Sequence, residues 1–318
     1  MPAARDVNLV VAVARLYYEQ DMSQSAIGTE LNLSRSNVSR ILTQARERGV
    51  VEIVIHDPEG PPVRLPELEE RIAELFALRE VHVVGATRAS GGEATAREGA
   101  AVIVHRLPGV RSIGVSWGRA VQSVIARLEP QQLRPVPEVL PLVGGLSALD
   151  QLESGESVLR ALASKVGARP HTLYAPAILE SVETVRTLRT ESTIASVLEA
   201  AARVELALVG IGSVGVASAP HIVQRMGLSA QEREQLDAQE PVGDICARLV
   251  DATGSPIGPP ASERVLAVTL EELRTIPEVV GVASGVEKAP GVCGVLRSGA
   301  LDTAVLDEHL AREVLARA

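Results

Sequence analysis

The chain has 318 residues, of which 46% are hydrophobic and 22% charged, and its formal net charge is −9. This length predicts two domains, and this composition is typical of a soluble globular protein. The apolar runs end well short of the ~20 residues that a membrane helix needs.

Targeting and metal-binding signals are missing from the sequence as well. The N-terminus MPAARDVN contains no apolar segment of the kind found in signal peptides. Cys246 and Cys293 stand in no CxxC motif and near no histidine pair, so we expect neither a zinc site nor a disulfide framework. We therefore expect a cytoplasmic protein without membrane association, metal or cofactor.

The negative charge is unevenly distributed along the chain. Residues 1–56 contain six arginines and six acidic residues, so the remainder carries the whole net charge of −9. Within residues 32–49 a single acid, Glu47, accompanies four arginines: Arg35, Arg40, Arg46 and Arg48. Positive charge concentrated on one candidate helix is typical of a small DNA-binding element.

Three helices are predicted at the N-terminus. Apolar side chains at helical spacing predict the first over residues 7–20. Ser23 is a suitable N-cap for a second helix ending near Leu31. Asn32 tolerates the left-handed backbone of a tight turn, and Ser34 is a suitable N-cap for the third helix.

The apolar spacing across this turn is that of a helix-turn-helix. Arginine can bind guanine, asparagine can bind adenine, and serine can bind phosphates or base edges. The alternative is a small helical bundle with a solvated charged face. A strand predicted from VVEIVIHD would make a winged variant. The residues that we expect to contact DNA are Ser34, Arg35, Ser36, Asn37, Ser39 and Arg40.

The first 56 residues also resemble a known family. The stretch ARLYYEQDMSQSAIGTELNLSRSNVSRILTQARERGVVEIVI resembles the N-terminus of the SorC family of sugar-responsive regulators (SorC/DeoR-type), through LYY, SRSNVSR and RERGVVEI. We therefore predict a helix-turn-helix DNA-binding domain over residues 1–56, with double-stranded operator DNA as its partner.

Residues 57–78 are predicted to connect the domains. Four prolines and a glycine in DPEGPPVRLP favour a semi-rigid linker. An amphipathic helix follows, with apolar side chains at near-heptad spacing. It could pair two subunits or lie on its own domain, and the sequence leaves both open. These apolar residues are Leu65, Leu68, Ile72, Leu75 and Phe76.

Residues 79–318 alternate short apolar strands with helical patterns. The predicted strands are VHVVG, SIGVS, EVLPLVG, HTLYAP, ELALVGIG, a segment near 264–269, VVGVASG and TAVLD. Such alternation predicts an α/β domain with a doubly wound, Rossmann-like parallel sheet. Ligands bind such sheets beyond the carboxyl ends of the strands.

Three glycine-rich loops follow predicted strands. Glycine lets a backbone approach an anion closely, and N–H groups at a helix start can bind it. Together they predict a phosphate or polyol pocket, where Trp117 could stack on a sugar or belong to the core. The loop residues that we expect there are Gly114, Ser116, Gly118, Arg119, Gly144, Gly145, Leu146, Ser147, Gly212 and Ser213.

Two charged side chains complete the predicted site. Asp244 begins an apolar run, where a carboxylate could bind sugar hydroxyls. Lys288 stands at a predicted helix start, where a cation opposes the helix dipole unless it faces an anion. The alternative for Lys288 is a solvated surface lysine. Asp307 occupies a similar position and could equally be an N-cap.

The family resemblance continues to the C-terminus, through SIGVSWGRAV, LPLVGG, LYAPAI, ALVGIGS, PVGDICARLVD and the tail from GVASGVEKAP. It implies a fold like that of ribose-5-phosphate isomerase and glucosamine-6-phosphate deaminase, a phosphorylated sugar inducer and a tetramer. It places the Gly144–Ser147 loop and Lys288 toward phosphate, and Asp244 toward hydroxyls. Pro290 and its segment PGVCGV depart from the more usual alanine-rich helix.

We therefore predict a DNA-binding transcriptional regulator controlled by a sugar phosphate or polyol bound in a domain over 79–318, and acting as a homodimer or homotetramer. The alternative is an isomerase-like or deaminase-like enzyme with an added DNA-binding domain. The six histidines form no pair at a predicted strand end, although Asp244 or Glu287 could serve as a base. We predict no catalytic residue.

Overall fold

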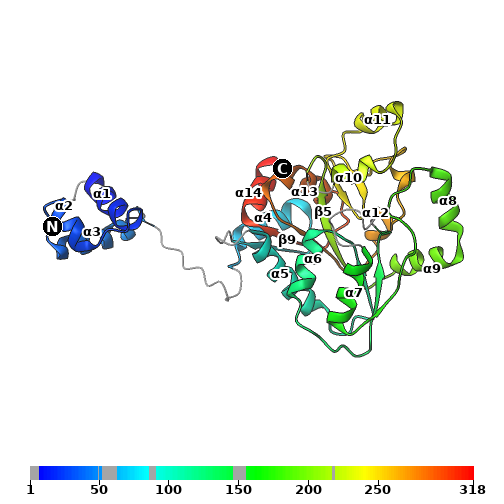
Figure 1. The fold of residues 1–318 in the computed structure, drawn as a ribbon, viewed down its shortest axis with the longest axis horizontal. Helices are drawn as coiled ribbons and strands as arrows, with labels where there is room; N and C mark the ends of the chain where they lie inside the picture. The colour runs from blue at the N-terminus through cyan, green and yellow to red at the C-terminus, as the bar shows by residue number, and fades with distance from the viewer. Residues whose placement is uncertain (1–6, 49, 52–62, 86–90, 146–154, 217–218) are drawn as a thin grey trace. The chain divides into compact units, whose positions relative to one another are not determined.

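The computed structural model describes residues 7–48, 50–51, 63–85, 91–145, 155–216 and 219–318. The chain forms two compact units, Met1–Pro58 and Glu59–Ala318 (Figure 1). The strand predicted from VVEIVIHD and most of the proline-rich linker lie outside the described residues.

The first unit contains three helices, α1 (Val7–Tyr18), α2 (Gln24–Glu30) and α3 (Arg35–Glu47). Their shared core confirms the predicted apolar spacing. The Ser23 hydroxyl accepts the N–H of Ala26 (3.2 Å), and Asn32 has a φ of 52°, as the turn requires. A Cβ on Gly28 would lie 2.6 Å from the Leu33 carbonyl oxygen, so glycine allows α2 to pack against this turn. The buried core residues are Val10, Val13, Ala14, Ile27, Val38, Ile41, Leu42 and Ala45.

The second unit is built on a mixed sheet with the strand order β1-β9-β8-β5-β2-β3-β4. All neighbours along this path are parallel, which confirms the Rossmann-like α/β class predicted from the alternation. The strands are β1 (Glu80–Val84), β2 (Ser112–Val115), β3 (Glu138–Pro141), β4 (Arg169–Pro170), β5 (Leu206–Ser213), β8 (Val279–Ala283) and β9 (Thr303–Asp307).

Helices cover both faces of this sheet (Figure 1). On one face α5 (Gly91–Arg106), α6 (Arg119–Arg127) and α7 (Gly155–Val166) share a core with the strands. The other face buries α4 (Pro66–Phe76), α13 (Ala289–Arg297) and α14 (Glu308–Arg317). The remaining helices are α8 (Val182–Thr190), α9 (Ser192–Ala201), α10 (Ala219–Gln224), α11 (Ala230–Asp237) and α12 (Leu270–Leu273), with short 3₁₀ turns η1 (Ser262–Arg264) and η2 (Val286–Lys288).

The direction in which the chain adds successive strands to the sheet reverses between β2 and β5. From β2 the chain continues outward to β3 and β4, whereas from β5 it continues the opposite way to β8 and β9. The connections at the carboxyl ends of β2 and β5 therefore diverge, and a crevice opens between them. This is the topological switch point at which such folds bind ligands.

An antiparallel hairpin extends β5 beyond the parallel sheet. It consists of β6 (Gly243–Ile245) and β7 (Arg248–Val250), and β6 pairs with the end of β5. The sequence did not predict this hairpin. Two predicted strands, HTLYAP and the segment near 264–269, are wrong. These segments form only isolated bridges, in which Pro176 pairs with Gly145 and Val265 pairs with Ile178.

Helix α4 lies on its own unit. Leu68, Ile72 and Phe76 are buried in the core that α4 shares with β1 and α14, and the Arg297 guanidinium lies 5.8 Å from the Phe76 ring centroid. Leu75 points away and is 50% exposed. Pairing between subunits through this helix stays a prediction. No helix in the described part of the chain is long and apolar enough to cross a membrane.

Candidate functional site

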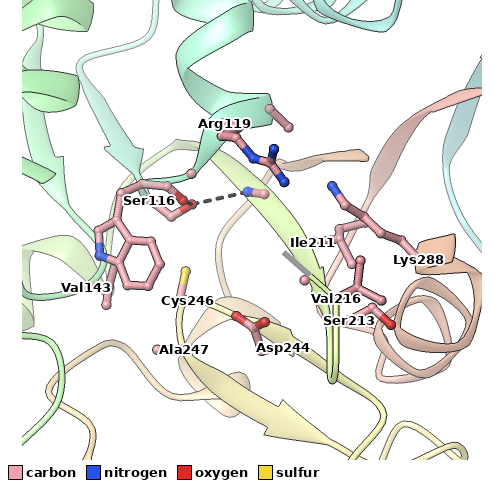
Figure 2. A pocket seen from close by; sticks show the side chains of 15 residues that line it. Ser116, Arg119, Val143, Ile211, Ser213, Val216, Asp244, Cys246, Ala247 and Lys288 are labelled. Atoms are coloured by element: carbon pink, nitrogen blue, oxygen red, sulfur yellow. Dashed lines mark hydrogen bonds between the residues drawn. The ribbon is translucent and has the colours of Figure 1, made fainter. Parts of the chain in front are cut away.

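A cavity of about 50 Å³ occupies the switch point between β2 and β5 (Figure 2). Its walls come from the loop after β2, the end of β5, the β6–β7 hairpin and η2. Seven predicted effector residues meet here: Ser116, Gly118, Arg119, Gly212, Ser213, Asp244 and Lys288. The other lining residues are Trp117, Ala120, Val143, Gly210, Ile211, Val216, Cys246 and Ala247.

Two cations border this pocket. Figure 2 shows the side chains of Arg119 and Lys288 extending toward one another from opposite walls. No ion pair joins either of them to a described residue. Burial, followed by the charge of Arg119, lowers the pKa of Lys288 below its ordinary value. The charges of Glu287, Asp244 and Asp307 oppose this shift, although none of these carboxylates forms an ion pair with Lys288. Two neighbouring positive charges that no described carboxylate pairs with directly favour an anion between them.

A helix N-terminus adds to this positive potential. Arg119 is the first residue of α6, and Gly118 precedes it with a φ of 132°, a conformation that favours glycine. No side chain caps this end of α6, so its first N–H groups have no side-chain acceptor. An anion beside Arg119 would therefore also meet the positive end of the helix dipole.

A buried carboxylate faces the cations across the pocket (Figure 2). Asp244 is only 6% exposed, and its Oδ1 has no hydrogen-bond partner among the described residues. Burial raises the pKa of Asp244 to about 6, although the Ala247 N–H and the charge of Lys288 oppose this shift. Such an acceptor suits the hydroxyl group of a ligand.

Glycines make room for this carboxylate. A Cβ on Gly212 would lie 1.8 Å from Asp244 Oδ1, so any larger residue would displace the side chain. Gly243 and Gly291 approach each other in the same way, since a Cβ on Gly243 would lie 2.6 Å from the Gly291 carbonyl oxygen. The glycines of PGVCGV therefore let α13 pack directly on β5 and β6, which explains this segment's departure from an alanine-rich helix.

The hydroxyls and the indole of the pocket already have backbone partners. Ser116 Oγ accepts the N–H of Gly210 (3.2 Å), and Ser213 Oγ accepts the N–H of Gly291 (3.3 Å). Trp117 Nε1 donates to the Gly144 carbonyl (2.9 Å). These bonds fix the walls of the pocket, and Trp117 is both a lining residue and a neighbour of the core.

A wider cleft of about 710 Å³ adjoins the pocket. Arg119, Ala120 and Lys288 line both cavities, so the cations stand at their junction. The first turns of α5 form another wall of the cleft, through Glu93 and Thr95. No group of three or more side chains suited to a metal ion occurs in the described ranges.

In the first unit, the predicted DNA-contacting residues share the front of α3. Ser34, Arg35, Ser36, Ser39 and Arg40 are exposed, and Asn37 is half-buried. Ser34 Oγ accepts the N–H of Asn37 (3.2 Å) and so caps the helix. The apolar side of α3 faces the core, which leaves this polar front available to DNA.

Comparison with known proteins identifies the family. The family model "Putative sugar-binding domain" matches residues 61–316, and the model "Sigma-70, region 4" matches residues 12–48. The chain is 29% identical to the sorbitol operon regulator of Klebsiella pneumoniae, over 99% of this chain and 100% of that protein. It is also 29% identical to the deoxyribonucleoside regulator of Bacillus subtilis, over 96% and 97%.

A solved structure agrees with these matches. The full-length sorbitol operon regulator SorC from Klebsiella pneumoniae superposes with a TM-score of 0.70 at 30% identity, covering 98% of this chain and 100% of that one. The chain belongs to the SorC family of sugar-binding transcriptional regulators. It is a DNA-binding regulator controlled by a metabolite, and the enzymatic alternative is not favoured.

Several predicted effector residues of this SorC-family regulator lie outside the pocket lining. Gly114 lies within β2, where a Cβ would meet Leu142 at 2.5 Å, so glycine serves packing there. Gly144 similarly approaches Pro176, and Gly145 pairs with the same segment. Leu146 and Ser147 lie outside the described residues.

The pocket of this SorC-family regulator also has walls that the sequence did not predict. Cys246 and Ala247 form the two-residue turn of the β6–β7 hairpin, with φ of 51° and 61°. Such turns normally use Asn-Gly or Asp-Gly, and neither dipeptide is present, so the usual hairpin signal is absent. Burial raises the pKa of the Cys246 thiol far above its ordinary value, so it is a neutral wall residue.

Proposed function

We propose that this regulator responds to a phosphorylated sugar bound at the switch point. The observation that supports this most directly is the pair of cations, Arg119 and Lys288, beside the uncapped N-terminus of α6. They lie opposite Asp244, whose Oδ1 has no hydrogen-bond partner among the described residues. A phosphate would bind between the cations and the first N–H groups of α6. The sugar hydroxyls would then donate to Asp244 and to nearby backbone carbonyls.

We propose that the front of α3 reads operator DNA in the major groove, through the six residues predicted from the sequence. A single helix-turn-helix covers only one half-site, so a homodimer or homotetramer in the cytoplasm would present two recognition helices at a fixed spacing. The effector would then change operator affinity by favouring one arrangement of the subunits.

We infer a regulator without catalytic activity. Its relatives are named as regulators. Among the described residues that line the pocket itself Asp244 is the only carboxylate, whereas Glu287 lines the adjoining cleft. An isomerase or deaminase needs a general acid and a general base at the reacting carbon. The neutral Cys246 and the already bonded Ser116 and Ser213 supply neither.

A thermal-shift panel of sugar phosphates and their unphosphorylated parents tests this proposal. A compound at 100 times its Kd stabilises the folded state by about 2.7 kcal/mol. We expect one sugar phosphate, but not its parent, to raise the melting temperature. A shift from a free polyol alone would mean that the pocket binds hydroxyls and no phosphate.

The DNA-binding assignment predicts the effect of Arg40→Ala. Loss of a base or phosphate contact is expected to weaken binding to an operator selected in vitro by about 1–3 kcal/mol, without changing effector affinity. Arg15→Ala on α1, an exposed residue 4.0 Å from Glu19, is the matched control and should bind DNA normally. Equal operator binding by Arg40→Ala and the native chain would remove Arg40 from the interface.

The Asp244 carboxyl predicts a pH dependence. Hydroxyl donors stabilise its ionised form, and its pKa of about 6 means that protonation competes with the effector below this pH. Affinity should therefore rise with pH through 6 and level off above it, with a loss of about tenfold from pH 7 to pH 5. Because a phosphate also titrates near pH 6, the ratio of native to Asp244→Asn affinities is the quantity to measure. A ratio independent of pH would contradict this role.

A further inference from the structure

The effector unit begins with a short attachment to the edge of its sheet. Residues 52–62 join the two units, and Val63 is the first described residue after them. Leu65 donates its N–H to the Val83 carbonyl (3.0 Å), and Gly85 donates to the Val63 carbonyl (2.8 Å). Any change that passes along the chain toward the DNA-binding unit must pass through this point.

One side chain secures the attachment. Arg64 makes a bidentate contact with Glu69 of α4 (2.5 and 2.8 Å) and a single contact with Glu98 of α5 (3.1 Å). It also donates to the Val81 carbonyl of β1 (3.2 Å). Arg64 thus ties the start of the unit to three separate elements.

Glu98 is itself held in a fixed position. Its Oε1 lies 2.6 Å from Nδ1 of His82, and Nε2 of the same ring lies 2.7 Å from Glu80. The ring of His82 therefore lies between the two carboxylates and contacts one with each nitrogen. Burial alone would raise the pKa of Glu98, but His82 and Arg64 together lower it below its ordinary value.

Helix α5 connects this cluster to the effector pocket. Next to Glu98, a Cβ on Gly99 would lie only 2.8 Å from Val124 of α6, so the two helices pack without a gap. Arg127 at the end of α6 pairs with Glu93 in the first turn of α5 (2.9 Å). The first residue of α6 is Arg119, one of the two cations of the pocket.

We propose that the Arg64–Glu98 ion pair transmits effector binding to the DNA-binding unit. An anion bound at Arg119 changes the position of α6. Helix α5 moves with α6, because the two helices are closely packed at Gly99. The movement of α5 displaces Glu98, and through the ion pair it displaces Arg64 and the start of the effector unit. Arg64 is thus a positioning residue, which contacts neither effector nor DNA. This inference rests on the proposed effector pocket.

Operator affinity with and without effector tests this coupling. The probes are ribose 5-phosphate, glucose 6-phosphate and sorbitol 6-phosphate, each against the full chain and an operator selected in vitro. In Arg64→Gln and Glu98→Gln, the active probe should change operator affinity by less than about twofold. Probe affinity and probe-free operator affinity should stay within about threefold of native, which separates lost coupling from a merely structural defect.

A matched control and a probe-free measurement complete the test. Arg71→Gln removes the same charge from an exposed site on α4. In this variant the active probe should change operator affinity by the same factor as in the native chain. Gly99→Ala should speed hydrogen exchange of the Leu65 and Gly85 amides, because it forces α5 and α6 apart without any ligand. The proposal would be overturned if the probe changed the operator affinity of Arg64→Gln as much as that of the native chain. It would also be overturned if Gly99→Ala left the hydrogen-exchange rates of these two amides unchanged. Failure of all three probes with the native chain would count against the proposed function, and the exchange measurement would still decide the coupling.

Discussion

Replacing Lys288 by alanine is expected to raise the Kd for the sugar phosphate by about 10- to 100-fold. A hydrogen bond to a charged group contributes about 1.5–3 kcal/mol, and the variant loses one such bond together with half of the cation pair. The half-buried Lys288 makes no ion pair with a described residue, and its charge only partly offsets the effect of burial on Asp244. Stability without effector should therefore fall little, and calorimetric titration of the folded variant measures the effect.

Lys165 provides the control for this prediction. It is the other lysine of the chain and lies on α7, away from the residues that line the pocket. Lys165→Ala should bind the effector with native affinity, which excludes a general effect of reduced charge. Native affinity in Lys288→Ala would instead remove the cation pair from the phosphate site.

Gly212→Ala is expected to lower effector affinity by about tenfold or more. The added methyl group would lie 1.8 Å from Asp244 Oδ1, and the carboxylate must leave the position from which it accepts hydroxyl groups. Such overpacking costs about 1–3 kcal/mol of folding stability as well. Effector titration and thermal unfolding of the same variant measure the two effects.

A double-mutant cycle separates this clash from other consequences of the methyl group. In an Asp244→Ala background the clashing oxygen is absent, so Gly212→Ala should have little further effect on effector binding. Gly258→Ala controls for the loss of a glycine, because its Cβ would have ordinary contact with Gln239 at 3.4 Å. If Gly212→Ala weakens binding equally in both backgrounds, the explanation through Asp244 is wrong.

Much of the fold could be predicted because local chemistry agrees with the tertiary structure. The cap at Ser23, the left-handed Asn32 and the buried spacing of α2 and α3 all identify the helix-turn-helix. Strands such as β5 and β8 are buried on both faces and therefore stand out as continuous apolar runs. The β6–β7 hairpin was missed because Cys246 and Ala247 carry no turn signal, although both adopt positive φ.

The candidate site could also be predicted only in part from the sequence. Arg119, Asp244 and Lys288 could be selected from sequence, because a charged group at a strand end or helix start has few structural explanations. Glycines were harder to assign, since the same residue type serves packing at Gly114 and makes room for a carboxylate at Gly212. Their difference lies in which atoms stand nearby, and these come from distant parts of the chain.

The most direct test of the effector mechanism is a fluorescence-anisotropy titration of operator DNA with the full chain, in the presence and absence of the sugar phosphate that raises its melting temperature. We expect this compound to change operator affinity by about 5- to 150-fold, and its unphosphorylated parent to have no effect. We expect the same compound to have no effect on Lys288→Ala at the concentration that saturates the native chain. An unchanged operator affinity of the native chain, with the pocket occupied, would contradict control of DNA binding from this site.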